Sequence, residues 1–414
     1  MRGKAVAFLM VLASVAFAQV DSLREMQRQL TILTEEIERL KLGEVSEPTY
    51  TPSKGLGAAA TKVYQLKKAG VSIAGYGEVL YQNYSRTLDN GGRSSRKDQI
   101  DYLRNVIYFG YRYNDWILFN SEVEVEHGST GKGGEVSVEF GYVELMFNKH
   151  LNLRAGMVLL PLGITNEKHE PSLFFPTLRP EVERSVIPTT WRANGLGLYG
   201  EITPSLSYRA YLVEGLRADR FGSADGIRGG RQSGAQSIAE NLAVSGKLEY
   251  SGIEGTTLGL SAYIGNSEQG MADTAALTTV LSAHAEFAWK GFEGRGLYAH
   301  VSLDQAELVS RLAKTSVGSV MNGYYVSLGY DLIRHLPLDS EQALVPFVQY
   351  EWLNTHASVP HGFVANSALD RSILTVGLSY KPHPHVALKF DWRDNSNKAN
   401  TGNDQWNIAV CYLY

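Results

Sequence analysis

From Gly70 to the end of the chain, apolar and polar residues alternate with a period of two in short segments. In the last segment, Trp406, Ile408 and Val410 alternate with Asn407 and Ala409. Successive side chains of a β-strand point to opposite faces, so each segment predicts a strand with one apolar and one polar face. Sixteen segments fit this description, at approximately 70–84, 99–113, 116–126, 135–147, 151–160, 194–202, 205–216, 241–251, 256–265, 278–290, 294–305, 318–332, 344–354, 371–381, 385–395 and 404–414.

The connections between these segments alternate in length. Those after odd-numbered segments are mostly long, such as 86–97 and 217–240, and those after even-numbered segments are mostly short, such as 114–115 and 203–204. This alternation is typical of outer-membrane barrels, which have short periplasmic turns and long external loops. Closure also removes unpaired edges from hydrocarbon, and sixteen strands leave room for an aqueous channel. The sequence therefore predicts a sixteen-stranded antiparallel transmembrane β-barrel over residues 70–414.

The connection 161–193 has neither helical nor strand periodicity. It contains five prolines and several large apolar residues, which are Pro161, Pro171, Pro176, Pro180, Pro188, Leu173, Phe174, Phe175, Val186, Ile187 and Trp191. An irregular loop of this length inside a domain is usually functional or disordered, and a disordered segment rarely carries so many apolar anchors. We therefore expect the loop to fold into the barrel lumen and to narrow the pore.

The N-terminal region predicts three further segments. Residues 1–18 resemble a secretory signal peptide, with Arg2 and Lys4 before an apolar run that ends in Ala16-Phe17-Ala18; the alternative, a membrane anchor, would be too short to span comfortably. Residues 19–43 predict a coiled-coil helix, and residues 44–69 predict a linker with a short helix around 58–68. The heptad seam consists of Leu23, Met26, Leu30, Leu33, Ile37 and Leu40. Self-association through this seam is favoured over a single helix lying on the barrel or membrane.

Composition adds a few constraints. The 414 residues carry a net charge of −4, which gives no indication of nucleic-acid binding. The 41 glycines and 23 tyrosines suit many short strands with tight turns and interfacial aromatic residues. Cys411 is the single cysteine, so an intramolecular disulfide is excluded.

Three stretches of the chain resemble the phosphate-selective porin O/P family of Gram-negative outer membranes. They are Gly75-Tyr76-Gly77-Glu78, Tyr142-Val143-Glu144-Leu145, and the segment containing Leu160-Pro161-Leu162-Gly163, Glu183-Arg184-Ser185 and Arg192-Ala193-Asn194-Gly195. The resemblance covers roughly residues 70–414. It implies a homotrimeric sixteen-stranded porin of the outer membrane, in contact with lipid, whose third external loop folds inward.

A channel of this kind selects solutes through its pore radius and the charges that line its constriction. The candidate solute-binding cations are Lys168, Arg179, Arg184 and Arg192 in the loop, and Arg154 and Arg209 on the adjoining wall. Guanidinium and ammonium groups attract anions, but they could instead pair with loop carboxylates and pin the loop to the wall. The predicted lumen carboxylates Glu122, Glu124 and Glu126 repel anions. We therefore expect a general or weakly selective channel for small hydrophilic solutes or ions, with phosphate as one candidate.

Three other functions have less support in the sequence. A hydrolase barrel would use pairs such as Ser282 and His284 or His300 and Ser302, but such spacing is common by chance in strands. A metal site at 383–385 would have two histidines without a nearby carboxylate or cysteine set. No enzyme activity, cofactor or metal is expected. A structural alternative is an outer-membrane anchor that tethers the envelope to the cell wall through residues 19–43.

Overall fold

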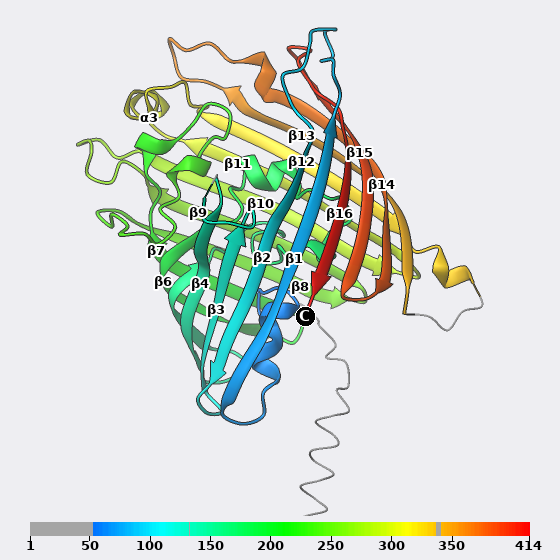
Figure 1. The fold of residues 1–414 in the computed structure, drawn as a ribbon. Helices are drawn as coiled ribbons and strands as arrows, with labels where there is room; N and C mark the ends of the chain where they lie inside the picture. Colours follow the sequence, from blue (N-terminus) through cyan, green and yellow to red (C-terminus); the bar gives the residue numbers. More distant parts are fainter. Residues whose placement is uncertain (1–52, 132, 337–340) are drawn as a thin grey trace, which may run out of the picture. The chain divides into compact units, whose positions relative to one another are not determined.

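The computed structural model describes residues 53–131, 133–336 and 341–414. The predicted signal peptide (1–18), the coiled-coil helix (19–43) and the linker up to residue 52 lie outside these ranges. The rest of the chain forms the predicted sixteen antiparallel strands, closed into a barrel in which β1 pairs with β16 and every other strand pairs with its sequence neighbours (Figure 1).

The strands have the following bounds: β1 (Gly70–Tyr84), β2 (Gln99–Arg112), β3 (Ile117–Glu126), β4 (Glu135–Met146), β5 (Asn152–Leu159), β6 (Arg192–Thr203), β7 (Leu206–Glu214), β8 (Leu242–Ile253), β9 (Thr256–Asn266), β10 (Leu277–Trp289), β11 (Phe292–Leu303), β12 (Val320–Tyr330), β13 (Ala343–Ser358), β14 (Asp370–His383), β15 (Val386–Asn397) and β16 (Gln405–Leu413). Each one overlaps its predicted segment. Strand β6 begins two residues earlier than expected, because Arg192 and Ala193 continue the ladder opposite Leu159 and Val158.

Short helices occupy several connections and the segment before β1. They are η1 (Ala59–Gln65), η2 (Pro171–Leu173), α2 (Glu181–Ser185), η3 (Ala218–Arg220), η4 (Arg228–Gly230), α3 (Ala306–Ala313), η5 (Ile333–His335) and η6 (Ser367–Leu369). The period-two pattern did not predict α3, although its residues favour a helix and Glu307 pairs with Arg311 one turn later. No helix in the described residues has the length and apolar character needed to cross a bilayer.

The two faces of the strands are sorted as the alternation predicts. In β16, Trp406 and Ile408 are each 49% exposed on the outer surface, whereas Asn407 is fully buried. The outer surface is therefore apolar around the barrel, as a lipid-facing surface must be.

The inner face is less uniformly polar than the pattern suggested. Tyr76, Tyr108, Leu118, Phe140 and Tyr142 are buried on the inward sides of β1 to β4. These side chains belong to a core cluster that also contains residues of η1 and of the connection between β5 and β6. The inner face is apolar here because other parts of the chain pack against it.

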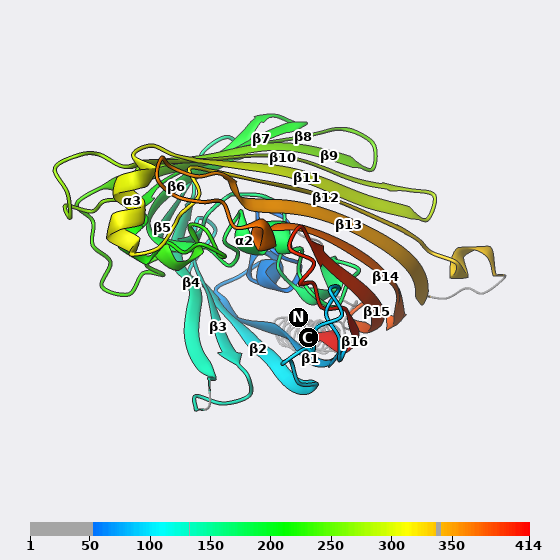
Figure 2. The same ribbon diagram turned by 90° about the horizontal axis from the view of Figure 1, so that it is seen from above.

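The connection between β5 and β6 lies inside the barrel, where Figure 2 shows α2 surrounded by the wall strands. We call residues 160–191 the inward loop. Leu160, Leu162, Ile164, Ile187 and Trp191 in this loop are at most 2% exposed. The loop thus has a packed core of its own.

Lipid contact can be tested at Leu260, which is 62% exposed in the middle of β9. A charge on the lipid face near the bilayer centre costs about 2–4 kcal/mol. We expect Leu260→Arg to lower the free energy of unfolding in phospholipid vesicles by this amount, measured by urea titration. Leu260→Phe is the matched control and should unfold near the wild-type midpoint; equal midpoints for both variants would contradict a lipid-facing position.

The lumen as the candidate functional site

The inward loop is held by cationic side chains of the wall. On β15, the buried ammonium group of Lys389 donates hydrogen bonds to the carbonyl oxygens of Pro171, Phe174 and Pro176, the last two over 2.6 and 2.9 Å. Arg295 of β11 donates to a fourth carbonyl, that of Leu173. Irregular backbone leaves carbonyl groups without ladder partners, and buried carbonyl groups need partners. The wall cations supply those partners.

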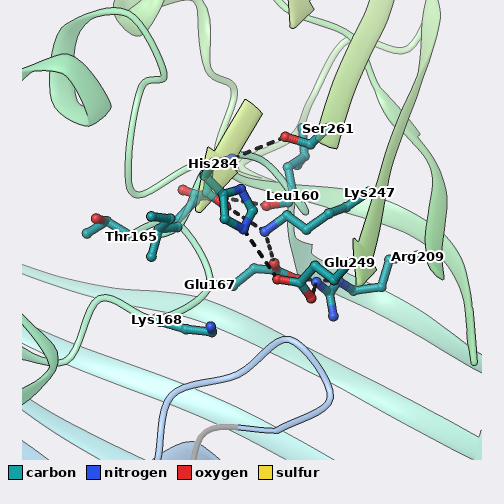
Figure 3. Close-up of polar contacts among 12 residues, drawn as sticks. Leu160, Thr165, Glu167, Lys168, Arg209, Lys247, Glu249, Ser261 and His284 are labelled. Carbon is teal, nitrogen blue, oxygen red and sulfur yellow. Dashed lines mark hydrogen bonds and ion pairs between the residues drawn. The ribbon is translucent and has the colours of Figure 1, made fainter. Parts of the chain in front are cut away.

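A second contact is a buried charge cluster on β7, β8 and the loop (Figure 3). The carboxylate of Glu167 lies 3.0 Å from Arg209 and 2.5 Å from Lys247. Lys247 also donates to the carbonyl of Gly163 over 2.6 Å, and Arg209 also pairs with Glu249. Both charge signs are thus matched within the cluster, as burial of several ions requires.

The two ends of the loop are joined by Glu183. Its carboxylate accepts hydrogen bonds from the backbone N–H groups of Ile164 and Thr165, from the Thr165 hydroxyl, and from the hydroxyl of Tyr325 on β12. Glu183 is fully buried. One carboxylate therefore fixes the fold of the loop and attaches it to the wall.

Three of the predicted solute-binding cations are engaged in these wall contacts. Arg154 is 2% exposed and lies 2.6 Å from Glu144, Arg209 belongs to the cluster around Glu167, and Lys168 lies 2.8 Å from Glu286 on β10. None of the three is among the described residues that line the charged cavity of the lumen. Their positions correspond to the pinning role that the sequence left as an alternative.

The other three predicted cations, Arg179, Arg184 and Arg192, line one cavity of about 780 Å³ between the inward loop and the wall. The cavity lies toward the ends of β1, β2 and β14 to β16 that carry the long loops. Ten arginines and six glutamates line it: Arg93, Arg96, Arg104, Arg179, Arg184, Arg192, Arg228, Arg231, Arg371, Arg393, Glu78, Glu124, Glu126, Glu135, Glu139 and Glu181. We call it the arginine cavity.

Carboxylates neutralise four of these arginines. Arg104 pairs with Glu78 and Glu124, and Arg192 pairs with Glu135 and Glu139. Glu181 pairs with both Arg184 and Arg371, over 2.9 and 3.1 Å. Within the described ranges, the other six arginines form no ion pair; they are Arg93, Arg96, Arg179, Arg228, Arg231 and Arg393.

Arg228 and Arg231 extend into the cavity from the connection between β7 and β8. Their guanidinium groups donate to backbone carbonyls of the inward loop, including those of Thr189 and Thr190. Burial, and next the neighbouring charge of Arg228, lower the pKa of Arg231 to about 9. The group remains charged at neutral pH and forms no ion pair with the described residues, so it is a candidate anion contact.

Seven of the ten arginines were not predicted as site residues, because the predicted cations came from the inward loop and the wall beside it alone. Arg104, Arg371 and Arg393 are inward residues of β2, β14 and β15, and the alternation along those strands could have found them. Arg93, Arg96, Arg228 and Arg231 come from other loops, and no local pattern places those loops over the lumen.

The predicted lumen carboxylates have different surroundings. Glu122 is fully buried and lies 2.9 Å from His169 of the inward loop, so its charge is matched there when His169 is protonated. Glu124 pairs with Arg104, and Glu126 lines the arginine cavity. Anions entering the cavity would therefore meet fewer free carboxylates than the strand pattern suggested.

Glu170 joins the inward loop to the segment before β1. Its Oε1 accepts hydrogen bonds from the backbone N–H groups of Ala59 and Ala60, over 2.9 and 3.2 Å, while Oε2 has no partner among the described residues. Burial raises the pKa of Glu170 to about 7. A proton on Oε2 would fit this arrangement.

The residues weighed for catalysis and metal binding have contacts within the wall. The hydroxyl groups of Ser282 and Ser261 are 2.6 Å apart, and Nε2 of His284 lies 3.6 Å from Glu249. The rings of His383 and His385 pack edge to face, with centroids 5.1 Å apart. In the described part of the chain, no group of three or more histidine, cysteine, aspartate or glutamate residues is arranged to hold a metal ion.

Comparisons with known proteins give one relative and several similar structures. An uncharacterized protein of Aquifex aeolicus is 38% identical over 390 residues, which cover 91% of this chain and 87% of that protein. No family model matches the chain. The anion-selective porin from Comamonas acidovorans aligns with a TM-score of 0.55 at 13% identity, over 84% of this chain and all of that one. The outer membrane channel DcaP of Acinetobacter baumannii aligns with a TM-score of 0.53 at 11% identity, over 84% of this chain and 98% of that one. At these identities the structural likeness establishes the barrel fold.

The role of Lys389 can be tested by Lys389→Met, which keeps the length of the side chain and removes three hydrogen bonds. A hydrogen bond to a charged group contributes about 1.5–3 kcal/mol, and water in the lumen would replace part of this stabilisation. We therefore expect the free energy that holds the loop against the wall to fall by roughly 2–4 kcal/mol in total. Trypsin should then cleave the folded barrel after Arg179 or Arg184. Lys398→Met, at an exposed lysine paired with Asp370, is the control; resistance to trypsin equal to that of wild type would contradict the clamp.

The pKa of Glu170 predicts a dependence of stability on pH. Because folding raises this pKa from an ordinary value near 4.5 to about 7, the folded protein binds more protons than the unfolded chain in that window. The stabilisation is therefore complete below about pH 4.5 and declines by on the order of 3 kcal/mol as the pH rises to 7. Glu170→Gln should remove this component, seen as a flatter curve of unfolding free energy against pH. Parallel curves for the variant and wild type would contradict the assignment.

Proposed function

We propose that this chain, which belongs to the same family as the uncharacterized protein of Aquifex aeolicus, is an outer-membrane porin for the passive diffusion of small hydrophilic solutes. The single observation that carries the proposal is a closed, externally apolar barrel that contains a charged cavity beside an inward loop. An apolar exterior suits lipid, and a charged interior suits water and solutes.

We further propose that the channel prefers anions, with phosphate-bearing solutes among the candidates. The arginine cavity has ten guanidinium groups and six carboxylates, and six of the arginines form no ion pair within the described ranges. An excess of fixed positive charge in a narrow passage attracts anions and repels cations. The anion preference is therefore more specific than the general or weakly selective channel expected from the sequence.

Several finer assignments are part of the same proposal. Membership of the phosphate-selective porin O/P family is supported by the three sequence stretches quoted above. Export through a signal peptide at 1–18 and assembly as a homotrimer, aided by the heptad helix at 19–43, are supported by sequence alone. The alternative, an outer-membrane anchor that tethers the envelope through residues 19–43, concerns a segment outside the described residues and stays a prediction from the sequence.

Planar-bilayer recordings test the function directly. The purified protein should form channels whose reversal potential in a salt gradient shows preference for chloride over potassium. Charge removal in Arg228→Gln/Arg231→Gln should lower the anion-to-cation permeability ratio by roughly two-fold or more, because two unneutralised charges leave the cavity.

Arg311→Gln is the matched control, because Arg311 lies on α3, pairs with Glu307 and is absent from the cavity lining. It should leave the ratio unchanged. A wild-type protein that forms no channels would overturn the porin function, whereas cation selectivity would overturn the anion preference alone.

A further inference from the structure

The segment that precedes β1 does not behave as a simple connection. Residues 53–66 pack inside the barrel, at the end that carries the short turns, with η1 against β1, β2 and β3. Leu56, Ala58, Ala59, Ala60 and Val63 are each at most 3% exposed. The sequence predicted a linker with a short helix around 58–68; the structure has η1 within that range and buries the segment against the wall.

Polar groups of the wall hold this segment from several sides. Arg154 of β5 donates to the carbonyl of Lys54 over 2.9 Å, and Asn120 of β3 donates to the carbonyl of Ala60 over 3.0 Å. The hydroxyl of Tyr64 donates to Glu144 of β4 over 2.7 Å. Arg154 and Glu144, which also pair with each other, therefore have a specific function in holding the segment.

Three glycines show how closely the surfaces fit. A Cβ at Gly57 would lie 2.4 Å from a carboxylate oxygen of Glu170, and a Cβ at Gly110 on β2 would lie 2.7 Å from the Cβ of Val63. Gly55 has a positive φ of 71°, and a Cβ there would lie 2.4 Å from a carboxylate oxygen of Glu167 and 3.0 Å from the side chain of Arg209. Both the segment and the wall thus have glycine where the other approaches.

The segment and the arginine cavity occupy different parts of the lumen. None of residues 53–66 is among the described residues that line the cavity. Residues of the inward loop such as Arg179 line the cavity, whereas Glu170 of the same loop is not among the lining residues and binds the backbone of η1. A solute that leaves the cavity toward the short-turn end would meet the buried segment beyond the loop.

We propose that residues 53–66 are a displaceable plug that narrows the short-turn half of the lumen, with Glu170 and Arg154 as its latches. The proposal rests on the porin function and adds a second restriction to that of the inward loop. Displacement is physically reasonable because the buried side chains are small or medium-sized, three of the six being alanine, whereas docking must order the backbone of the whole segment. Release of the plug widens the passage.

The first test displaces the plug with Gly57→Leu, which places a branched side chain against the Glu170 carboxylate. Single-channel conductance in planar bilayers should rise about two-fold or more, and larger uncharged polyethylene glycols should enter the pore. Gly222→Leu is the control, since a Cβ there meets nothing within 4 Å. Conductance equal to wild type in the folded Gly57→Leu protein would overturn the plug.

The second test remains decisive if Gly57→Leu does not fold. In a Cys411→Ala background, Val63→Cys/Gly110→Cys places two Cβ atoms near the separation of about 3.8 Å found in disulfides, after a shift of roughly 1 Å. Oxidation should hold the conductance at a low level, and reduction should raise it. Equal conductance in the oxidised and reduced proteins would show that residues 53–66 stay fixed against the wall, and would overturn the proposal that they are displaced. A wild-type protein without any conductance would instead count against the porin function.

Discussion

Irregular backbone can occupy the inside of a wide barrel only when its N–H and carbonyl groups find hydrogen-bond partners. The inward loop meets this requirement through side chains of the wall. Lys389 and Arg295 satisfy carbonyl groups around η2, Lys247 satisfies Gly163, and Glu183 satisfies the N–H groups where the loop begins. The restriction of the pore therefore depends on buried charges that perform a structural task.

This requirement divides the lumen charges into two groups. Charges such as Arg154, Arg209 and Lys247 are matched within buried clusters and position the loop or the segment before β1. Others, such as Arg228, Arg231 and Arg393, line a cavity without carboxylate partners in the described residues. Selectivity should depend on the second group. The opposite charges of a close ion pair largely cancel each other's electrostatic field at the position of a passing solute.

The sequence was sufficient for the barrel but insufficient for the site. A period of two, with alternating loop lengths, is a local property, so all sixteen strands and their outward faces could be recognised from it. Which arginines meet at one cavity depends on how loops from distant parts of the chain cross the lumen, and Arg231 illustrates this, since it contacts Thr190 across 41 residues of sequence. The burial of residues 53–66 was hidden for a related reason: runs of glycine and alanine are as typical of a linker as of a segment fitted tightly against a wall.

If the inward loop, clamped by the wall, is the main restriction of the proposed water-filled pore, its removal must widen the pore. The most direct test replaces residues 164–190 with a short glycine-serine turn and compares single-channel conductance with that of wild type in the same salt. Removal of the loop should raise the conductance several-fold, because it takes a large obstruction out of the lumen while the wall strands still close into a barrel. An unchanged conductance in a correctly folded barrel would contradict it.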